Sequence, residues 1–444
     1  MRTRIGRDGA LSSPEADAAI VRAAGYGMEF RHSRRRGLAA DFRDQYPDLA
    51  PRMPCSSTMS SLRLGLIGLG NIGRHHAGYL LENRVPRCQL TAVCAPTASK
   101  LEPYVAKGLR GFTDARALLD SGCVDAVLIA TPHYQHTSLG IAALEAGLHV
   151  MVEKPISAHK ADAERLLACA ARHPDRVLAG MFQQRVEPRY ARIRDLLERG
   201  ELGTLQRVTW INTDWFRTDT YYSSGGWRAT WKGEGGGVLL NQCLHNLDVL
   251  TWLLGMPARV RGFCQFGRWH AIEVEDEVSA HLVYPGGATG TFLSSTGEAP
   301  GTNRLEIAGS RGRLVLENNR LILTRNASDA LEWSRTATVG FSKPETTEEE
   351  IPFENAAAPH ATLMENFTAA ILDGVPLIAP GSDGLRSVEL ANAIVHSSLL
   401  DATVDLPLDG AAWEARLQRL IAESRFHKEV RAVATDDFAA SFRR

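Results

Sequence analysis

The chain has 444 residues, which exceeds a single ordinary hydrophobic core and predicts two domains. Its 50 Lys and Arg residues nearly balance 51 Asp and Glu residues, so no overall field favours nucleic acid or a membrane surface as a partner. The seven cysteines include no Cys-x-x-Cys pair, and no apolar run approaches membrane-spanning length. We therefore expect no disulfide framework, no zinc knuckle, and a reducing, cytoplasmic location.

Residues 1–58 differ in composition from the rest of the chain. They are rich in small and charged residues, include Arg34-Arg35-Arg36, and show no sustained apolar period. The arginines could belong to a twin-arginine export signal, but no apolar stretch follows them. We expect this segment to be a disordered extension, or an over-long start with the natural one at Met53 or Met59.

A short apolar strand predicted at 62–67 leads directly into Gly68-Leu69-Gly70-Asn71-Ile72-Gly73. This G-x-G-x-x-G spacing, followed by a helix predicted at 74–81, is typical of a turn that binds a dinucleotide pyrophosphate. Such a turn is tight, lets the ligand approach the backbone, and brings helix and strand close together. The helix N-terminus adds unpaired N–H groups for the phosphates. The alternative is a glycine-rich turn without a ligand.

The strand predicted at 90–94 is not followed by an acidic residue. The chain continues Ala95-Pro96-Thr97, with Ser99 and Lys100 beyond. A carboxylate at this place would bind a ribose 2′-hydroxyl and repel a 2′-phosphate, whereas hydroxyls and a lysine accommodate one. We therefore expect NADP, or both NADP and NAD, rather than strict use of NAD.

Further strand–helix units follow at similar spacing. Strands are predicted at 124–130, 149–152 and 177–182, with helices at 114–120 and 139–147. Such repetition predicts a doubly wound parallel sheet, in which strand ends share the edge where ligands bind.

Two polar segments end these strands. The strand at 124–130 runs into Thr131-Pro132-His133-Tyr134-Gln135-His136, and the strand at 149–152 runs into Glu153-Lys154-Pro155. Pro155 biases Lys154 towards an extended backbone, so we expect the lysine to be presented at the sheet edge. The alternative for Glu153-Lys154 is a surface ion pair after a strand.

Beyond a helix predicted at 188–199, the pattern changes to short strands joined by turns. Strands are predicted at 207–212, 260–265, 278–284, 288–293, 304–308 and 314–316, which indicates a mostly antiparallel sheet with an open face. Helices are predicted at 360–372, at 382–399 and around Trp413–Ile421, and the end from about 432 is expected to be frayed.

The segment 210–248 combines aromatic rings with polar side chains. Six aromatic residues surround Arg217 and Arg228, and they are Trp215, Phe216, Tyr221, Tyr222, Trp227 and Trp231. Flat rings with interspersed donors suit a ring-shaped polyol, whose C–H face stacks while its hydroxyls form hydrogen bonds. The alternative is an aromatic-rich loop that closes over the core.

A glycine run, Gly235-Gly236-Gly237, precedes a helix predicted at 238–254. The spacing of Asn241, His245 and Asp248 places all three on one helical face. They could serve as metal ligands, but no cysteine or second histidine stands at suitable spacing, so we expect no metal.

The blocks GLGNIG, ATPHYQH, AGLHVMVEKPIS and GMFQQR together resemble the Gfo/Idh/MocA oxidoreductases, over residues 62 to 407. The resemblance implies that Lys154 is the active-site lysine beside a nicotinamide and that Glu153 contacts the adjoining ribose. It implies that Thr131, Pro132, His133 and His136 lie along the cofactor and that His245 is the catalytic histidine. Subunits of such proteins commonly associate through the C-terminal sheet, so a homo-oligomer is expected.

One position departs from the pattern of this family. Many members have aspartate where this chain has Asn241, and an asparagine can orient a hydroxyl but cannot carry charge or take a proton. Proton handling is therefore expected to fall to His245, with Lys154 as cationic support.

We expect an N-terminal Rossmann domain at 59–184, a substrate-binding and oligomerisation α+β domain at 185–410, and a C-terminal helix and tail at 411–444. The expected activity is NAD(P)-dependent oxidation or reduction, by hydride transfer, of a secondary hydroxyl or ketone of a sugar, sugar derivative or cyclitol. The expected cofactor-binding residues are Gly68, Gly70, Asn71, Ile72, Gly73, Thr97, Thr131, Pro132, His133, His136, Glu153 and Lys154. The expected substrate-binding residues are Trp227, Arg228, Asn241 and His245, and the catalytic pair is Lys154 and His245.

Two alternatives of other classes remain open. One is a glycosidase or lyase that keeps NAD tightly bound and oxidises its substrate transiently. The other is a non-catalytic regulator that binds the dinucleotide without turnover.

Overall fold

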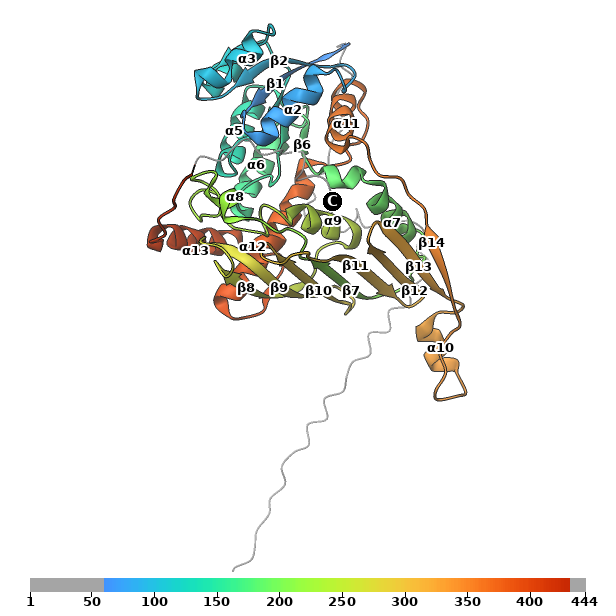
Figure 1. Cartoon of the computed structure of the whole chain (residues 1–444). Helices are drawn as coiled ribbons and strands as arrows, with labels where there is room; N and C mark the ends of the chain where they lie inside the picture. Colours follow the sequence, from blue (N-terminus) through green and yellow to red (C-terminus); the bar gives the residue numbers. More distant parts are fainter. Residues whose placement is uncertain (1–59, 432–444) are drawn as a thin grey trace, which may run out of the picture.

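The computed structural model describes residues 60–431, which form two units built on two sheets (Figure 1). The N-terminal half forms a six-stranded sheet of order β3-β2-β1-β4-β5-β6. The C-terminal half forms a nine-stranded sheet of order β14-β13-β12-β11-β7-β10-β9-β8-β15. The expected extension at 1–58 and the tail beyond 431 lie outside the described residues.

The six-stranded sheet is parallel throughout. Its strands are β1 (Leu62–Ile67), β2 (Cys88–Cys94), β3 (Arg110–Phe112), β4 (Ala126–Ile129), β5 (His149–Val152) and β6 (Leu178–Gly180). Its helices are α2 (Asn71–Leu81), α3 (Glu102–Val105), α4 (Ala115–Leu119), α5 (Tyr134–Glu145) and α6 (Lys160–Arg172). Every residue of β4 and β5 is buried, as continuous apolar runs covered on both faces require. The doubly wound parallel sheet predicted from the sequence is confirmed.

The nine-stranded sheet is antiparallel except for the pairing of β7 with β10. Its strands are β7 (Leu205–Asn212), β8 (Arg259–Phe266), β9 (Glu275–Val283), β10 (Thr289–Ser295), β11 (Asn303–Gly309), β12 (Gly312–Glu317), β13 (Arg320–Asn326), β14 (Thr346–Ile351) and β15 (Val404–Asp405). Along β11, Leu305 and Ile307 are buried while Arg304 and Glu306 are only partly so. One face of the sheet is therefore packed and the other is open and polar.

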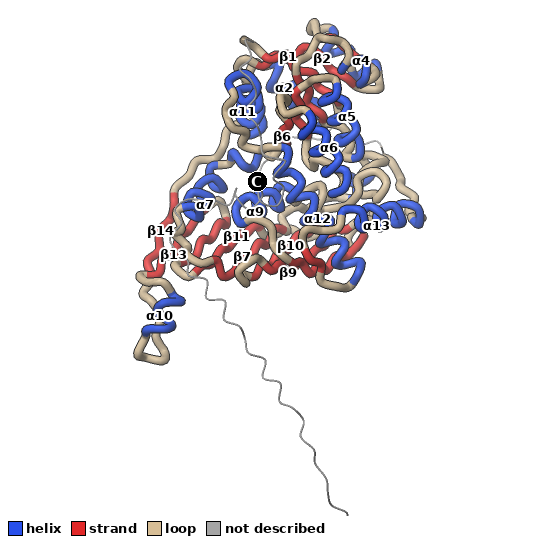
Figure 2. The backbone as a smooth tube through the Cα atoms, turned by 180° about the vertical axis from the view of Figure 1, so that it is seen from behind, coloured by secondary structure: helices blue, strands red, loops and turns tan. Residues whose placement is uncertain are grey.

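Three helices lie on the packed face, between the nine-stranded sheet and the six-stranded unit (Figures 1 and 2). They are α7 (Pro188–Glu198), α9 (Leu244–Leu254) and α12 (Gly384–Leu400). The helices α11 (Pro359–Asp373) and α13 (Gly410–Glu423) return to the first unit, where α11 packs against α2 and α13 against α6. The end of the described chain thus ties the two units together.

Several elements differ from those predicted. The helix after the glycine turn begins at Asn71 rather than 74, and α5 begins at Tyr134 rather than 139, so His136 lies in its first turn. The strands β3, β13, β14 and β15 were not predicted. The strands β3 and β15 are very short, and β14, with its three glutamates, is polar and exposed, whereas β13 has buried leucines that carried a usable signal. The helix predicted at 238–254 is wrong in its first six residues, which form turns.

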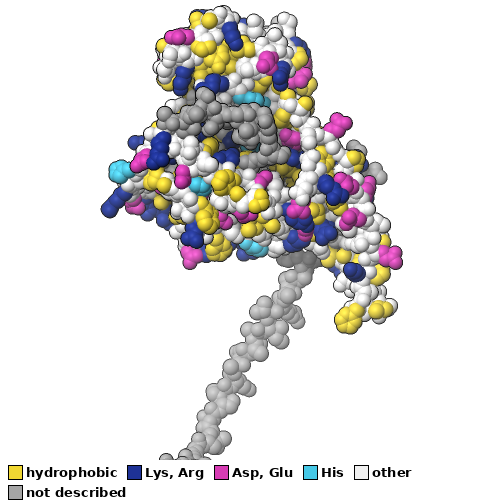
Figure 3. All heavy atoms as spheres, in the orientation of Figure 1, with side chains coloured by type: hydrophobic (Ala, Val, Ile, Leu, Met, Phe, Trp, Pro, Cys, Tyr) yellow, Lys and Arg dark blue, Asp and Glu magenta, His cyan; other side chains and the backbone are white. Residues whose placement is uncertain are grey.

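The short helix α10 (Ala330–Thr336) and the loop after it form an arm that projects from the edge of the nine-stranded sheet (Figure 1). Hydrophobic side chains gather at the tip of the arm (Figure 3), where Val339 and Phe341 are exposed. Between residues 60 and 431, none of the helices has both the length and the apolar character needed to cross a membrane.

Candidate functional site

The segments that follow β1, β2, β4 and β5 lie side by side at one edge of the six-stranded sheet. Backbone hydrogen bonds connect them at the last residues of the strands: Gly68 N donates to Cys94 O at 2.9 Å, Ala130 N to Ile67 O at 2.8 Å and Glu153 N to Ile129 O at 2.9 Å. The predicted cofactor-binding residues therefore share this edge, with Thr97 on the exposed turn after β2.

The glycine turn has the shape that a dinucleotide requires. Gly68 has a φ of +103°, and a Cβ on it would lie 2.5 Å from Ala130 O. A Cβ on Gly73 would lie 2.0 Å from Gly68 O, whereas a Cβ on Gly70 would have no atom within 4 Å. The first and third glycines thus serve the turn and its packing, and the second leaves room beside the backbone. The N-terminus of α2, which includes Asn71 and Ile72, has neither a side-chain cap nor an acidic residue in its first turn. These features fit a pyrophosphate.

Glu153 is buried beneath this edge, with an exposed fraction of 5%. His76 Nε2 donates to its Oε1 at 2.6 Å, while its Oε2 accepts from the Lys154 backbone N at 3.0 Å. The Tyr79 hydroxyl lies 2.7 Å from His76 Nδ1 and fixes the ring from behind. Burial raises the pKa of Glu153, but the hydrogen bond and charge of His76, with the charges of His360 and Lys154, outweigh it and lower the pKa to about 2. The carboxylate is therefore ionised.

The Lys154 side chain crosses from the six-stranded unit to the other half of the chain. Its Nζ donates to the backbone oxygen of Asn241 at 2.9 Å and lies 3.4 Å from Asn241 Oδ1. Burial lowers the pKa of Lys154, and the charges of Glu153 and Glu234 oppose this effect. The alternative of a surface ion pair does not hold, because the lysine reaches Asn241, a partly buried residue in the other half of the chain.

The two histidines after β4 hold neighbouring loops in place. His133 Nδ1 donates to the backbone oxygen of Glu234 at 3.1 Å, which fixes the N–H on that nitrogen. The ring nitrogens of His136 lie 2.7 Å from Pro155 O and 2.8 Å from Thr131 O. Burial lowers the pKa of both imidazoles. His133 thus joins the segment after β4 to the loop that contains Glu234, and His136 braces the turn after Lys154.

Asn241 does not lie on a helix, contrary to the sequence-based expectation. The helix α9 begins at Leu244, because the backbone N–H groups upstream are bound elsewhere. Glu275 Oε1 accepts from Gly237 N at 2.8 Å and from Leu239 N at 3.1 Å. A Cβ on Gly237 would lie 2.0 Å from Glu275 O, so this close approach requires glycine. The resulting turn places Asn241 beside Lys154.

Glu234 is a second buried acid in the site, with an exposed fraction of 2%. Its Oε2 accepts from Ala229 N at 2.5 Å, and its Oε1 accepts from the Asn241 side-chain amide. Burial raises the pKa of Glu234, against the opposing influence of Arg228, the two N–H donors and Lys154. The site therefore contains a carboxyl group that the sequence analysis did not single out.

His245 lies in the first turn of α9 and is buried. The Gln183 side-chain amide donates to His245 Nε2 at 3.4 Å, which leaves the lone pair of the ring on that nitrogen. One turn further, Asp248 forms a buried bidentate ion pair with Arg185, at 2.7 and 2.9 Å. Asp248 thus anchors the short helix η3 (Gln183–Val186) to α9, and the alternative of a metal triad with His245 has no support.

The aromatic segment divides into two groups. Tyr222, Trp215 and Trp231 are buried and serve the core, as the structural alternative predicted. Tyr221 and Trp227 are only partly buried and lie against arginines. The Arg228 guanidinium lies 4.5 Å from the centroid of the Tyr221 ring and 4.7 Å from that of Trp227. The ring of Trp227 also meets His133 edge to face, at 5.7 Å. Phe216 is about half exposed and stays apart.

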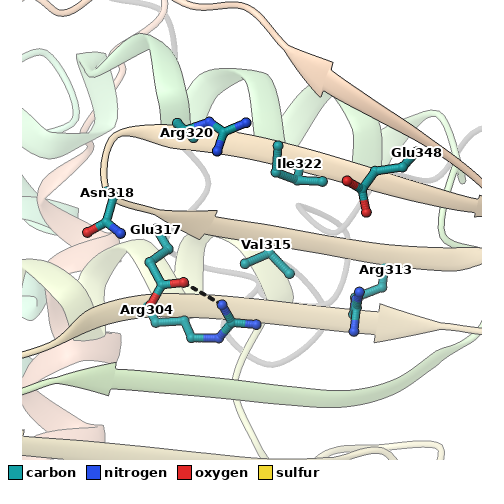
Figure 4. A pocket seen from close by; sticks show the side chains of 8 residues that line it. All are labelled: Arg304, Arg313, Val315, Glu317, Asn318, Arg320, Ile322 and Glu348. Atoms are coloured by element: carbon teal, nitrogen blue, oxygen red, sulfur yellow. Dashed lines mark hydrogen bonds and ion pairs between the residues drawn. The ribbon is translucent and has the colours of Figure 1, made fainter.

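A separate hollow lies on the open face of the nine-stranded sheet (Figure 4). It is lined by side chains that alternate with the buried leucines of β11–β13, namely Arg304, Arg313, Val315, Glu317, Asn318, Arg320, Ile322 and Glu348. The helices α7, α9 and α12 cover the opposite face, so this hollow does not belong to the site around Lys154.

Four residues of the site were not predicted from the sequence: His76, Gln183, Glu234 and Glu275. His76 and Gln183 are adjacent to recognised motifs, in GLGNIGRHH and GMFQQR, so their positions carried a usable signal. Glu234 precedes a glycine run and Glu275 begins a strand, and at such positions an acid is ordinarily exposed.

Comparisons with known proteins agree with this geometry. A family model described as an oxidoreductase family with an NAD-binding Rossmann fold matches residues 62–181, and the GFO/IDH/MocA C-terminal domain matches residues 190–315. An inositol 2-dehydrogenase of Rhizobium meliloti is 27% identical over 346 residues, covering 76% of this chain and 97% of that protein. A levoglucosan dehydrogenase of Pseudarthrobacter phenanthrenivorans is 26% identical over 392 residues, covering 79% and 99%.

A solved structure shows the same architecture over most of the chain. The WlbA dehydrogenase from Bordetella pertussis, in complex with NADH and UDP-GlcNAcA, is 26% identical with a TM-score of 0.66, covering 79% of this chain and all (100%) of that one. The two family models follow one another along the chain, one matching the first sheet and one matching the second half as far as residue 315. The chain belongs to the Gfo/Idh/MocA family of NAD-binding oxidoreductases.

Proposed function

We propose that the protein is a dehydrogenase or reductase that acts on a secondary hydroxyl or ketone of a sugar, sugar derivative or cyclitol. The observation that carries the proposal is the Lys154 side chain, which extends from the glycine-turn edge to Asn241, on the turn that enters the helix of His245. The named activities of the inositol and levoglucosan relatives support this substrate class.

The residues present suit proton and charge handling at an alcohol. An ammonium has three N–H donors, and two of them are directed at Asn241, so Lys154 keeps one for a substrate oxygen. That donor stabilises the alkoxide as the hydroxyl loses its proton. His245 takes the proton on Nε2, where the substrate hydroxyl replaces the Gln183 amide as the partner of the lone pair. A bound nicotinamide dinucleotide supplies the hydride chemistry. Trp227 offers a flat face for the substrate ring, and Arg228 and Asn241 offer polar groups for its hydroxyls.

The test is a screen of monosaccharides, glycosides, anhydrosugars and inositols with NAD and NADP, followed by nicotinamide absorbance. The expected result is turnover of at least one of these classes by the wild type, with a large loss in Lys154→Ala and in His245→Ala. Circular dichroism of each variant provides the control for folding. If both variants retain nearly full turnover at saturating cofactor, the assignment of these residues is wrong.

We also propose that the chain uses NADP, or NADP and NAD, because Thr97, Ser99 and Lys100 are exposed after β2 and no carboxylate ends that strand. The Thr97 side chain makes no capping hydrogen bond, so its hydroxyl is available to a 2′-phosphate. Lys100→Glu should lower kcat/KM for NADP by roughly tenfold, with little change for NAD. Efficient turnover with NAD and none with NADP would overturn this preference.

We further propose a homo-oligomer that forms through the open face of the nine-stranded sheet, where the hollow of Figure 4 lies. Light scattering after size exclusion should give a mass above that of one chain. Ile322→Glu on this face should lower the mass, while Val105→Glu, exposed on the other half, should not. A wild type that is monomeric at micromolar concentration would contradict the proposal.

The compartment and the domain boundaries are inferred in the same way. We infer a reducing, cytoplasmic setting because the six cysteines in the described range form no disulfide, which cell fractionation can check. The proposed division into 59–184, 185–410 and 411–444 predicts that limited proteolysis cuts first near its boundaries.

A further inference from the structure

Glu234 differs from an ordinary loop acid because it is buried and both of its oxygens accept hydrogen bonds from N–H donors. Ala229 N donates to Oε2 at 2.5 Å and the Asn241 amide donates to Oε1. A protonated carboxyl would need an acceptor at one of these positions, whereas a carboxylate accepts at both. The arrangement therefore suits the ionised form.

The contact with Glu234 determines which end of the Asn241 side chain faces Lys154. An amide donates through its nitrogen and accepts through its oxygen, so the bond from Nδ2 to Glu234 leaves Oδ1 for Lys154. Lys154 Nζ lies 3.4 Å from this Oδ1 and 2.9 Å from the backbone oxygen of the same residue. A continuous hydrogen-bonded series thus runs from the carboxylate to the ammonium.

We propose that Glu234 is a positioning residue for the proposed oxidoreductase reaction: its buried carboxylate orients Asn241 towards Lys154 and supplies the negative charge that keeps this lysine protonated. The proposal rests on the function proposed above. It also gives Asn241 a role, because the negative charge that an asparagine lacks is provided seven residues earlier in the chain.

The other charged groups around Lys154 make this charge necessary. Burial favours the neutral amine, and Arg228 and Arg217 add positive potential. Of the two acids that oppose them, Glu153 is already bound to His76. The remaining titratable groups that interact with Lys154 are His133, His136, Cys243 and His360. The cations that face Glu234, besides Lys154, are Lys428 and Arg228.

The test measures how Lys154 titrates in the full chain, without relying on turnover. Amine modification at a series of pH values, quantified for the peptide that contains Lys154, gives its pKa in each variant. In Glu234→Gln this pKa should fall by about one unit, since an opposite charge nearby is removed. The basic limb of the kcat–pH profile should move in the same direction. Glu273→Gln is the matched control, because Glu273 binds Trp231 N on the same loop but makes no contact with Asn241.

A double variant, Glu234→Gln with Asn241→Asp, exchanges the two groups and keeps both the hydrogen bond and the charge. It should restore the titration of Lys154 to the wild-type value or above it, and it serves as the test if Glu234→Gln does not fold. An unchanged Lys154 pKa in Glu234→Gln overturns the proposal, as does a double variant whose lysine titrates below the wild type. If no sugar or cyclitol is turned over by the wild type, the proposed function fails while the lysine titration still decides the role of Glu234.

Discussion

Two buried glutamates act on Lys154, one from each half of the molecule, and their surroundings push their pKa values in opposite directions. Glu153 and Glu234 are 5% and 2% exposed, so burial raises the pKa of each. For Glu153, the hydrogen bond and charge of His76 reverse the effect and lower the pKa to about 2. For Glu234, burial prevails over its cationic neighbours and amide donors, and the pKa stays raised. The kind of partner, rather than burial, sets the ionisation behaviour of each acid.

The same contrast describes how the two halves are built. Glu153 is adjacent to Lys154 and ends a strand, in an arrangement that a local motif encodes. Glu234 is connected to Lys154 by hydrogen bonds only through the Asn241 side chain. The packing of the two units places this side chain beside the lysine. A substitution in one half can therefore be measured with the other half as its reference.

The largest effect is expected from Lys154→Met, which removes the cation on which both acids act. The variant loses the donor for the substrate oxygen, so kcat should fall by roughly 100- to 1000-fold. Steady-state kinetics at saturating cofactor measure the change. Cofactor affinity should change much less, and a loss of kcat below tenfold would contradict the role given to the lysine.

The opposite shifts of the two acids predict opposite pH dependences of stability. The pKa of Glu153 lies at about 2 instead of its ordinary 4.5, so this group stabilises the fold by about 3 kcal/mol above pH 4.5. The contribution disappears as the pH falls towards 2. The free energy of unfolding of Glu153→Gln should therefore fall below that of the wild type by the full amount at neutral pH, and the difference should shrink in acid.

For Glu234 the sign reverses. An acid whose pKa is raised on folding disfavours the fold when it is ionised, and this cost is absent below the unfolded pKa. Relative to wild type, the free energy of unfolding of Glu234→Gln should become more favourable as the pH rises above the ordinary pKa of 4.5. Urea unfolding of both variants, from about pH 2 up to neutral pH, checks the pair of slopes, and slopes of the same sign would refute the contrast.

The sequence allowed the cofactor half to be predicted well, for physical reasons. The shape of the turn at Gly68, Gly70 and Gly73 could be inferred from their spacing after a buried strand. The place of Lys154 at the sheet edge could be inferred from the apolar strand β5 that precedes it. Parallel strands bring their ends together without regard to the loops, so the shared edge could be inferred before any contact was known.

The substrate half could be predicted only in part. The expected helix at 238–254 fails at its start because Glu275, 36 residues from Leu239, takes the N–H groups of the turn. No local pattern announces this bond. Likewise, Asp248 reads as a polar residue on a helix face, but its bidentate partner Arg185 shows that it anchors the structure. Such roles depend on pairings that distant segments form only on folding.

A smaller effect is expected from Trp227→Leu, which alters the substrate half alone. The ring is held in place by His133 and by the Arg228 guanidinium. If a substrate ring stacks on it, as proposed, its removal should cost about 1–2 kcal/mol of binding free energy. KM should rise by about tenfold with kcat changed little. Trp269→Leu, at an exposed tryptophan in the connection between β8 and β9, is the control and should leave KM unchanged. A fall in kcat at constant KM would point to a role in chemistry instead.

The smallest effect concerns the segment after α13, whose residues Lys428 and Arg431 contact the loop at 223–228. Lys428 Nζ donates to Arg228 O at 2.5 Å, and Arg431 N donates to Ser223 O at 3.0 Å, so the segment after α13 holds the aromatic loop. Lys428→Met removes one hydrogen bond of about 1 kcal/mol, and the substrate KM should rise about fivefold. The dissociation constant of the cofactor, measured by fluorescence titration, should stay constant because its edge lies on the other unit. Lys343→Met, exposed on the arm, is the control. Equal losses of substrate and cofactor affinity would show that the two halves are coupled more tightly than their separate construction suggests.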